Sequence, residues 1–356
     1  MSDPLGHVSA SCRCRLASAS PRRHAGGRVS AVLAAARTGE AALPAPFLGE
    51  HARLPFAAAT YEITGDGGPA VAVLGGISAT RHLAAHEGDP SPGWWEAQVG
   101  PGRAIDTTRV RAIGIDYLGA GLREGDAVPL VSTADQARAL AAVLDAAGVG
   151  RLHALVGASY GGMVALAFAA LFPDRAGQVV VLSAAHQPHP MATAVRAVQR
   201  RVVRDGVACG RGREALALAR ALAMTTYRTG RELAGRFGGG WTVDGEGAAR
   251  FEVEAYLDHQ GSRYARRFTP ERFLCLSQSI DLHRVDPAAV TVPCTLLAVR
   301  GDPIAPAWQV AELATRLAGP CTRHELDSIY GHDAFLKEDD AVASLLTHAL
   351  GQETRA

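Results

Sequence analysis

The sequence predicts an α/β fold in which a mostly parallel sheet carries a helical cap, or lid, inserted between two of its strands. Three observations predict this fold. Strand and helix patterns alternate between about residues 110 and 182, strand patterns are absent between about 187 and 288, and a strand pattern returns at 294–300. Alternating strands and helices indicate parallel strands joined by right-handed crossovers. The helical stretch is then an insertion above the sheet.

The core elements follow in the order that such a sheet needs. Strands at 57–63 and 70–74 are separated by the turn sequence Gly65-Asp66-Gly67-Gly68. The next elements are a strand at 110–115, a helix at 132–147, a strand at 152–156, a helix at 161–172 and a strand at 178–182. In the insertion, helical periodicity is clearest at 213–227 and 251–260. A strand at 294–300, a helix at 308–317, a strand at 323–326 and a helix at 334–350 complete the core.

These patterns divide the chain into four parts. Residues 1–45 are rich in Ala, Ser, Arg and Gly without periodicity, so we expect a disordered extension that can be deleted without loss of activity. Ordered structure is expected from Leu54. Residues 46–186 and 291–356 form the two parts of the core, and residues 187–290 form the cap.

Composition favours a small-molecule enzyme. The chain has 356 residues, of which 48% are hydrophobic, enough for a substantial buried core. Its 36 Lys and Arg residues balance 35 Asp and Glu residues, for a net charge of +1. No overall field therefore favours binding to nucleic acid or to an anionic membrane.

The cysteines and the hydropathy pattern favour a cytoplasmic location. The six cysteines lack paired metal-ligand spacing, and only Cys12 and Cys14 lie close together. No apolar run reaches the roughly 18 residues needed to span a bilayer, and the N-terminus lacks the apolar stretch of a secretory signal.

A candidate nucleophile lies between a strand pattern and a helix pattern. Ser159 is the centre of Gly157-Ala158-Ser159-Tyr160-Gly161, which follows an apolar run and precedes a helical stretch. The G-x-S-x-G pattern alone is weak, but on a sharp strand-to-helix turn it presents the serine Oγ at the top of the sheet. The small residues Gly157 and Gly161 allow neighbouring backbones to pass closely.

A serine hydroxyl needs an adjacent base, which a third group must orient. In the α/β-hydrolase order the acid follows a late strand and the histidine lies on a loop near the C-terminus. Asp302 follows the strand at 294–300, and His332 lies in a glycine-containing loop before the last helix. The other candidates, less well placed, are Asp281, Asp286, Asp327, His324 and His348.

The same fold stabilises the oxyanion with two backbone N–H groups. One should come from Tyr160, directly after the nucleophile, and the other from the loop after an early strand. That loop begins Gly75-Gly76-Ile77-Ser78, and its glycines allow the backbone to turn inward. We therefore expect the Ile77 N–H to be the second donor, although a glycine turn without a ligand is the simpler alternative.

Several strings together resemble the MetX-type homoserine O-acyltransferases, a branch of the α/β-hydrolase fold. They span about residues 70 to 345 and are Gly93-Trp94-Trp95, Gly100-Pro101-Gly102-Arg103-Ala104-Ile105-Asp106-Thr107, Gly157-Ala158-Ser159-Tyr160-Gly161-Gly162-Met163, Thr226-Tyr227-Arg228, Arg236-Phe237-Gly238, Phe251-Glu252-Val253-Glu254-Ala255-Tyr256-Leu257 and Gly331-His332-Asp333-Ala334-Phe335-Leu336.

The resemblance implies that Ser159, Asp302 and His332 are catalytic and that Arg228 and Asp333 contact the acceptor substrate. Homoserine carries a carboxylate and an ammonium group, which a guanidinium and a carboxylate suit. A surface ion pair for Arg228 and a helix N-terminal charge for Asp333 are the alternatives. The resemblance also implies a homodimer formed through the cap.

The loop at 74–82 departs from the family's commonest string and resembles that of the succinyl-using members. We therefore expect succinyl-CoA rather than acetyl-CoA as the donor, with Arg81 and His82 meeting the distal carboxylate. The residues assigned to donor specificity are Gly75, Gly76, Ser78, Arg81 and His82.

The expected reaction is a ping-pong acyl transfer from acyl-CoA to L-homoserine, a step toward methionine. Acyl-CoA is a co-substrate, and we expect neither a metal ion nor a permanently bound cofactor. The alternatives are acetyl-CoA as donor, serine as acceptor, a hydrolase on the same scaffold, and a catalytically inactive binding protein.

Overall fold

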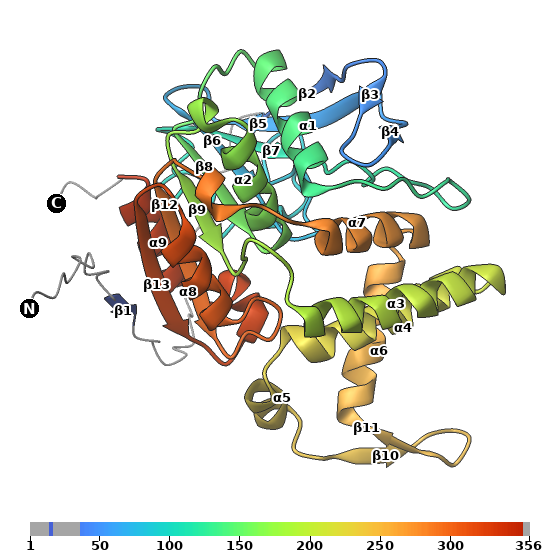
Figure 1. Ribbon diagram of the computed structural model, residues 1–356. Coiled ribbons are helices and arrows are strands. Elements are labelled where there is room, and N and C mark those ends of the chain that lie inside the picture. Colours follow the sequence, from blue (N-terminus) through green and yellow to red (C-terminus); the bar gives the residue numbers. More distant parts are fainter. Residues whose placement is uncertain (1–13, 17–35, 352–356) are drawn as a thin grey trace, which may run out of the picture.

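The computed structural model describes residues 14–16 and 36–351, and their main feature is a twisted sheet (Figure 1). Within these residues the sheet has nine strands in the order β1-β13-β12-β9-β8-β6-β7-β5-β2. The antiparallel pairs are β5 with β7 and β2 with β5, and the other ladders are parallel. The strands are β1 (Cys14–Leu16), β2 (Arg37–Ala42), β5 (Ala58–Thr64), β6 (Ala70–Leu74), β7 (Arg111–Ile115), β8 (Ala154–Ala158), β9 (Val179–Leu182), β12 (Cys294–Arg300) and β13 (Cys321–Asp327).

Helices cover both faces of this sheet. Helices α1 (Thr133–Ala146), α2 (Tyr160–Leu171) and α8 (Ala307–Arg316) pack on one face, and α9 (Asp339–Ala349) packs on the other. Every residue of β6, β8 and β9 is buried, as expected for central parallel strands covered on both faces. Three short 3-10 helices, η1 (Pro173–Arg175), η2 (Pro287–Ala289) and η3 (Gly331–Leu336), and the small hairpin of β3 (Phe47–Leu48) and β4 (Arg53–Leu54) complete this part.

The cap is a group of helices with its own small core. It contains α3 (Pro190–Ala208), α4 (Gly212–Tyr227), α5 (Gly230–Arg236), β10 (Trp241–Val243), β11 (Ala249–Phe251), α6 (Glu252–Ala265) and α7 (Pro270–Leu282). Val203, Leu216, Tyr264 and Phe273 pack together at its centre. Figure 1 shows these helices gathered beside one end of the sheet. They lie within the range 187–290 that the sequence assigned to the cap.

The fold class predicted from the sequence is the one observed, and most core elements lie within two residues of the expected positions. Two details differ. The cap contains the hairpin of β10 and β11, whose residues are all exposed and so carry no burial pattern that sequence reading could detect. The last predicted helix is divided into η3 and α9, with Lys337 ending the first of these.

The expectation that order begins at Leu54 is wrong. Strand β2 lies earlier and pairs with β5 over six residues, from Arg37 opposite Ile63 to Ala42 opposite Ala58. Ala41 and Leu43 are buried in the main core. Residues 37–42 therefore form an edge strand of the sheet, which contradicts the expected disorder of this part of the chain. The remainder of that predicted extension, apart from β1, lies outside the described residues.

Candidate active site

Ser159 lies at the sharp turn between β8 and α2. Its backbone has φ 54° and ψ −118°, a left-handed conformation that is strained for a residue with a side chain. Close packing enforces the turn. A Cβ on Gly157 would lie 2.3 Å from the Gly161 carbonyl oxygen, and one on Gly161 would lie 2.2 Å from the Leu74 carbonyl oxygen. The two glycines flanking the serine are thus required by backbone contacts.

The structure brings Ser159, His332 and Asp302 into one hydrogen-bonded chain. The Ser159 Oγ lies 2.7 Å from His332 Nε2, and His332 Nδ1 lies 2.7 Å from Asp302 Oδ2. Because the carboxylate accepts the proton on Nδ1, the neutral imidazole presents its Nε2 lone pair to the serine hydroxyl. The other oxygen of Asp302 accepts the N–H groups of Ile304 and Ala305, which fixes the carboxylate.

The electrostatics of His332 suit a general base. Burial disfavours the imidazolium and lowers the pKa of His332, but the charge and hydrogen bond of Asp302 outweigh this. The pKa of His332 therefore lies above the usual 6.5. Asp333 also raises this pKa, whereas Arg196 lowers it.

The loop after β6 passes beside the serine. A Cβ on Gly76 would lie 4.0 Å from Ser159 Cβ. The Gly75 carbonyl accepts both the Tyr117 hydroxyl, at 2.6 Å, and the Gly161 N–H, at 2.9 Å, which fastens the loop to the turn. Among the described residues no hydrogen bond uses the N–H of Tyr160 or Ile77. Both expected oxyanion donors are therefore available.

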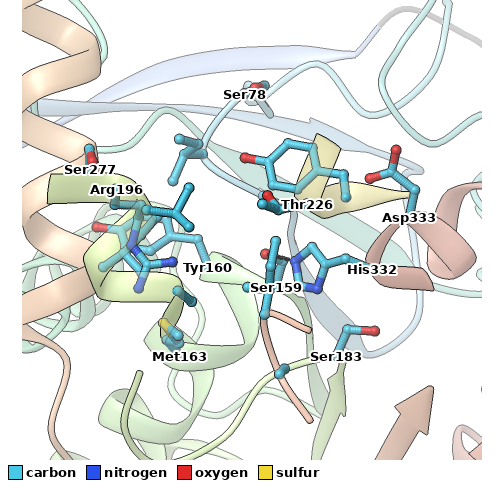
Figure 2. A pocket seen from close by; sticks show the side chains of 18 of the residues that line it. Ser78, Ser159, Tyr160, Met163, Ser183, Arg196, Thr226, Ser277, His332 and Asp333 are labelled. Atoms are coloured by element: carbon cyan, nitrogen blue, oxygen red, sulfur yellow. Dashed lines mark hydrogen bonds between the residues drawn. The ribbon is translucent and has the colours of Figure 1, made fainter. Parts of the chain in front are cut away.

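Ser159 and His332 open into a cavity between the core and the cap (Figure 2). The sheet side contributes Gly76, Ile77, Ser78, Ser159, Tyr160, His332 and Asp333. The cap side contributes apolar side chains, Tyr227 and the polar residues Arg196, Gln199, Arg220, Thr226 and Ser277. In Figure 2, Arg196 and Ser277 lie on one side of Ser159, and Asp333 lies on the other. The nucleophile thus lies between two polar regions of different charge.

The structure also brings together the two predicted acceptor residues. Arg228 Nη2 lies 3.2 Å from Asp333 Oδ2, and both side chains are largely buried. Asp333 lines the cavity, whereas Arg228, directly after α4, is not among the lining residues. The Arg228 Nε has no hydrogen-bond partner in the described part of the chain. This ion pair joins the cap to the loop that carries His332.

The expectation that Arg81 and His82 meet the acyl group is not supported by their contacts. Arg81 Nη1 lies 2.7 Å from Asp116 Oδ2, and the His82 ring lies against Glu62 and the Ser91 carbonyl. Neither residue lines the cavity, and Gly75 does not line it either. The contacts of Arg81 with Asp116 and of His82 with Glu62 and Ser91 hold both side chains outside the cavity lining. Of the residues assigned to donor specificity, Gly76 and Ser78 do line the cavity.

His82 belongs instead to a buried cluster with Glu62 and His86, whose possible metal-ligating atoms lie within 4.8 Å of one another. His86 Nδ1 accepts the N–H groups of Gly88 and Asp89. A neutral His86 therefore carries its proton on Nε2, 3.4 Å from a Glu62 oxygen, and has no lone pair there for an ion. The cluster is a hydrogen-bonded support for the loop.

Sequence reasoning missed Arg196, Gln199 and Arg220 as cavity residues. Arg196 and Gln199 lie on α3 and Arg220 on α4, two amphipathic cap helices. The sequence shows only that these polar residues lie in helices of the cap, each of which must turn one face toward the sheet. That signal does not say which of the many cap arginines faces inward.

Comparisons with known proteins identify the family of this chain. The family model described as alpha/beta hydrolase fold matches residues 69–339. A homoserine O-succinyltransferase of Xanthomonas campestris pv. campestris is 45% identical over 291 residues, 82% of this chain and 78% of that protein. The chain belongs to the MetX-type O-acyltransferase family of the α/β hydrolases.

Other members of the family differ in donor and acceptor. A serine O-succinyltransferase of Litchfieldella anticariensis is 31% identical over 334 residues, 82% of this chain and 91% of that protein. The crystal structure of a homoserine O-acetyltransferase from Bacillus anthracis superposes with a TM-score of 0.75 at 17% identity, covering 87% of this chain and 97% of that one. At this identity the structural likeness bears on the fold alone.

In residues 14–16 and 36–351, no helix combines the length and the apolar character needed to cross a bilayer.

We expect Asp302→Asn to lower kcat by about three orders of magnitude or more, because the amide no longer holds the imidazole in the required tautomer. The acid limb of the pH profile of kcat/KM should also move to lower pH. The reason is that the carboxylate charge raises the pKa of His332, which must be neutral to accept the serine proton.

The matched control is Asp327→Asn, at the exposed end of β13. It should leave the pH profile unchanged. Steady-state kinetics of the purified variants between pH 5 and 9, roughly the range in which histidine titrates, provide the measurement. An unmoved acid limb in Asp302→Asn would show that this carboxylate does not control the base.

Proposed function

We propose that this chain is a homoserine O-acyltransferase that transfers a succinyl group from succinyl-CoA to the hydroxyl of L-homoserine, in methionine biosynthesis. The observation that carries the proposal is the hydrogen-bonded chain of Ser159, His332 and Asp302 at the floor of a cavity covered by the cap. The 45% identity to a homoserine O-succinyltransferase supports the choice of substrates.

In the proposed first half-reaction, His332 Nε2 takes the Ser159 proton as Oγ attacks the thioester carbonyl of the donor. The negative charge on the carbonyl oxygen is held by the N–H groups of Tyr160 and Ile77. The tetrahedral adduct collapses, the C–S bond breaks, and CoA leaves after taking the proton from His332. Ser159 then carries the acyl group as an ester.

In the second half-reaction the homoserine hydroxyl attacks this ester. Homoserine is a zwitterion, and the Arg228–Asp333 pair offers the complementary charges, with the guanidinium for its carboxylate and Asp333 for its ammonium. His332 removes the hydroxyl proton and returns it to Ser159 Oγ as the ester bond breaks. O-succinylhomoserine is released and the free serine is restored.

Transfer must outcompete hydrolysis, because the same three groups serve esterases. The cap residues Met191, Phe273 and Ile280 give the cavity an apolar wall, which limits the water available near the acyl-enzyme. An acceptor held by two charges beside the base has a high effective concentration relative to that remaining water. The intact proton relay disfavours an inactive binding protein.

The test is an assay of CoA release with succinyl-CoA or acetyl-CoA, in the presence of homoserine, serine or no acceptor. We expect release to require homoserine, to be faster with succinyl-CoA, and to disappear in Ser159→Ala. Acceptor-independent release would identify a hydrolase, and preference for serine would change the acceptor. Full activity of Ser159→Ala would refute the mechanism.

We expect Arg228→Gln to raise the KM for homoserine about ten-fold or more, because a charge-assisted hydrogen bond to the substrate is lost. Formation of the acyl-enzyme, followed by intact-mass spectrometry without acceptor, should change much less. Arg231→Gln is the matched control, since Arg231 lies exposed on α5. Equal losses in both half-reactions would contradict an acceptor role for Arg228.

We also propose that the chain forms a homodimer through its cap. The cap exposes large apolar side chains that a monomer leaves in water, at Leu218, Trp241, Val243 and Phe251. Light scattering of the purified protein should give twice the chain mass, and Trp241→Glu should shift it toward the monomer. A monomeric wild-type protein would overturn this proposal.

The state of the cysteines bears on the cellular compartment. We propose the cytoplasm, because Cys209, Cys275, Cys294 and Cys321 are free thiols, which fits a reducing compartment. Acyl-CoA enters as a co-substrate and leaves as CoA, so the proposed cycle uses no permanently bound cofactor. Measured retention of free thiols in the protein isolated from cells is the check on this setting.

A further inference from the structure

A cluster of two arginines and one aspartate lies in the cap, between α3 and α7. Asp281 Oδ1 accepts Arg196 Nε at 2.9 Å, Arg196 Nη2 at 2.6 Å and the Thr193 hydroxyl at 2.7 Å. Asp281 Oδ2 accepts Arg200 Nη1 at 2.5 Å. All three charged side chains are about nine-tenths buried.

The charges in this cluster do not balance. Two guanidinium groups share one carboxylate, which leaves one positive charge in excess. Arg200 is further occupied by the carbonyl and hydroxyl oxygens of Ser277. Arg196, in contrast, leaves its Nη1 group without a hydrogen-bond partner among the described residues. Unlike Arg228 Nε, Arg196 Nη1 is not among the enclosed atoms without a partner, so a ligand in the cavity can reach it.

That free group belongs to the cavity of Ser159. Arg196, Gln199 and Ser277 all line it, and Figure 2 shows Arg196 and Ser277 on the side of Ser159 away from Asp333. Gln199 is almost fully buried and its amide has no hydrogen-bond partner in the part of the chain that the structure describes. The charge of Arg196 is also felt at His332, whose pKa it lowers.

We propose that Arg196 binds the distal carboxylate of the acyl group carried by Ser159, with Gln199 as an additional donor, and that Asp281 positions Arg196 for this role. The inference rests on the proposed acyl transfer and assigns the donor class, an acyl group that ends in a carboxylate. Succinyl is such a group. Acetyl leaves the excess positive charge unpaired.

Two features support positioning by Asp281. Arg196 meets it through two nitrogens, which fixes the plane of the guanidinium and directs the remaining edge into the cavity. Arg200 binds the other oxygen of Asp281, Oδ2. The single negative charge of Asp281 is therefore shared between two guanidinium groups and does not neutralise Arg196 fully. Of the proposed acceptor residues, Asp333 lines the cavity on the other side of Ser159, and Arg228 pairs with it from outside the lining, so the proposed donor and acceptor contacts use different arginines.

The experiment compares kcat/KM for succinyl-CoA with kcat/KM for acetyl-CoA, both with homoserine. Arg196→Gln should lower the ratio of the two values about ten-fold or more, the factor expected for losing a charge-assisted hydrogen bond. Arg196→Lys, which keeps the charge but not the bidentate geometry, should lower the ratio less. General damage to the fold lowers both values and leaves their ratio unchanged.

Arg201→Gln is the matched control, because Arg201 lies on the same helix with an exposed side chain paired to Asp205. Its ratio should equal that of the wild type. An unchanged ratio in Arg196→Gln overturns the inference, as does a wild-type enzyme that prefers acetyl-CoA. Failure of the wild type to acylate homoserine with either donor overturns the proposed function instead.

A second readout does not depend on turnover. In a Ser159→Ala background, succinyl-CoA should bind more tightly than acetyl-CoA in a calorimetric titration, and adding Arg196→Gln should remove that difference. Equal binding of the two donors in the Ser159→Ala protein would contradict a carboxylate contact at Arg196.

Discussion

The close approach of three backbone segments at Ser159 is the constraint on which the rest of the site depends. The Ser159 N–H donates to the Leu182 carbonyl, the Gly161 N–H donates to the Gly75 carbonyl, and Gly161 packs against Leu74. The nucleophile is thereby fixed to the ends of β6, β8 and β9. Strand β12 pairs with β9, so Asp302, which follows β12, is held in a fixed position relative to the Ser159 turn. The strained φ of Ser159 persists because these contacts over-determine it.

Much of this arrangement could be predicted from the sequence because it depends on local backbone rules. The turn at Ser159, the acid after a late strand and the histidine before the last helix all follow from the order of elements in a parallel sheet. Strand β2 could not be predicted, because its sequence from Arg37 to Ala42 is polar and small, and only pairing with β5 makes it a strand. Tertiary contacts override weak propensity at such an edge.

The charged residues of the site show where sequence reasoning ends. The sequence analysis assigned Arg81 to the donor carboxylate and did not single out Arg196. The direction of each side chain decides between them: Arg81 turns to Asp116, and Arg196 turns to the cavity. The direction of the Arg196 side chain depends on how α3 is rotated about its axis and on how it packs against α7. A single sequence specifies neither of these. Residue type indicated that a cation was needed, but the fold determined its position.

The core and the cap line different sides of the cavity and can therefore contact different parts of the acyl group. The loop after β6 places backbone N–H groups beside Ser159, and its side chains Arg81 and His82 are held by Asp116 and Glu62. That wall can stabilise an oxyanion, but it cannot recognise a second charge at the far end of the acyl group. Recognition of that charge must come from the opposite wall, which is the cap. The proposed contact with Arg196 therefore separates recognition of the donor, in the cap, from the hydrogen-bonded chain of Ser159, His332 and Asp302 in the core.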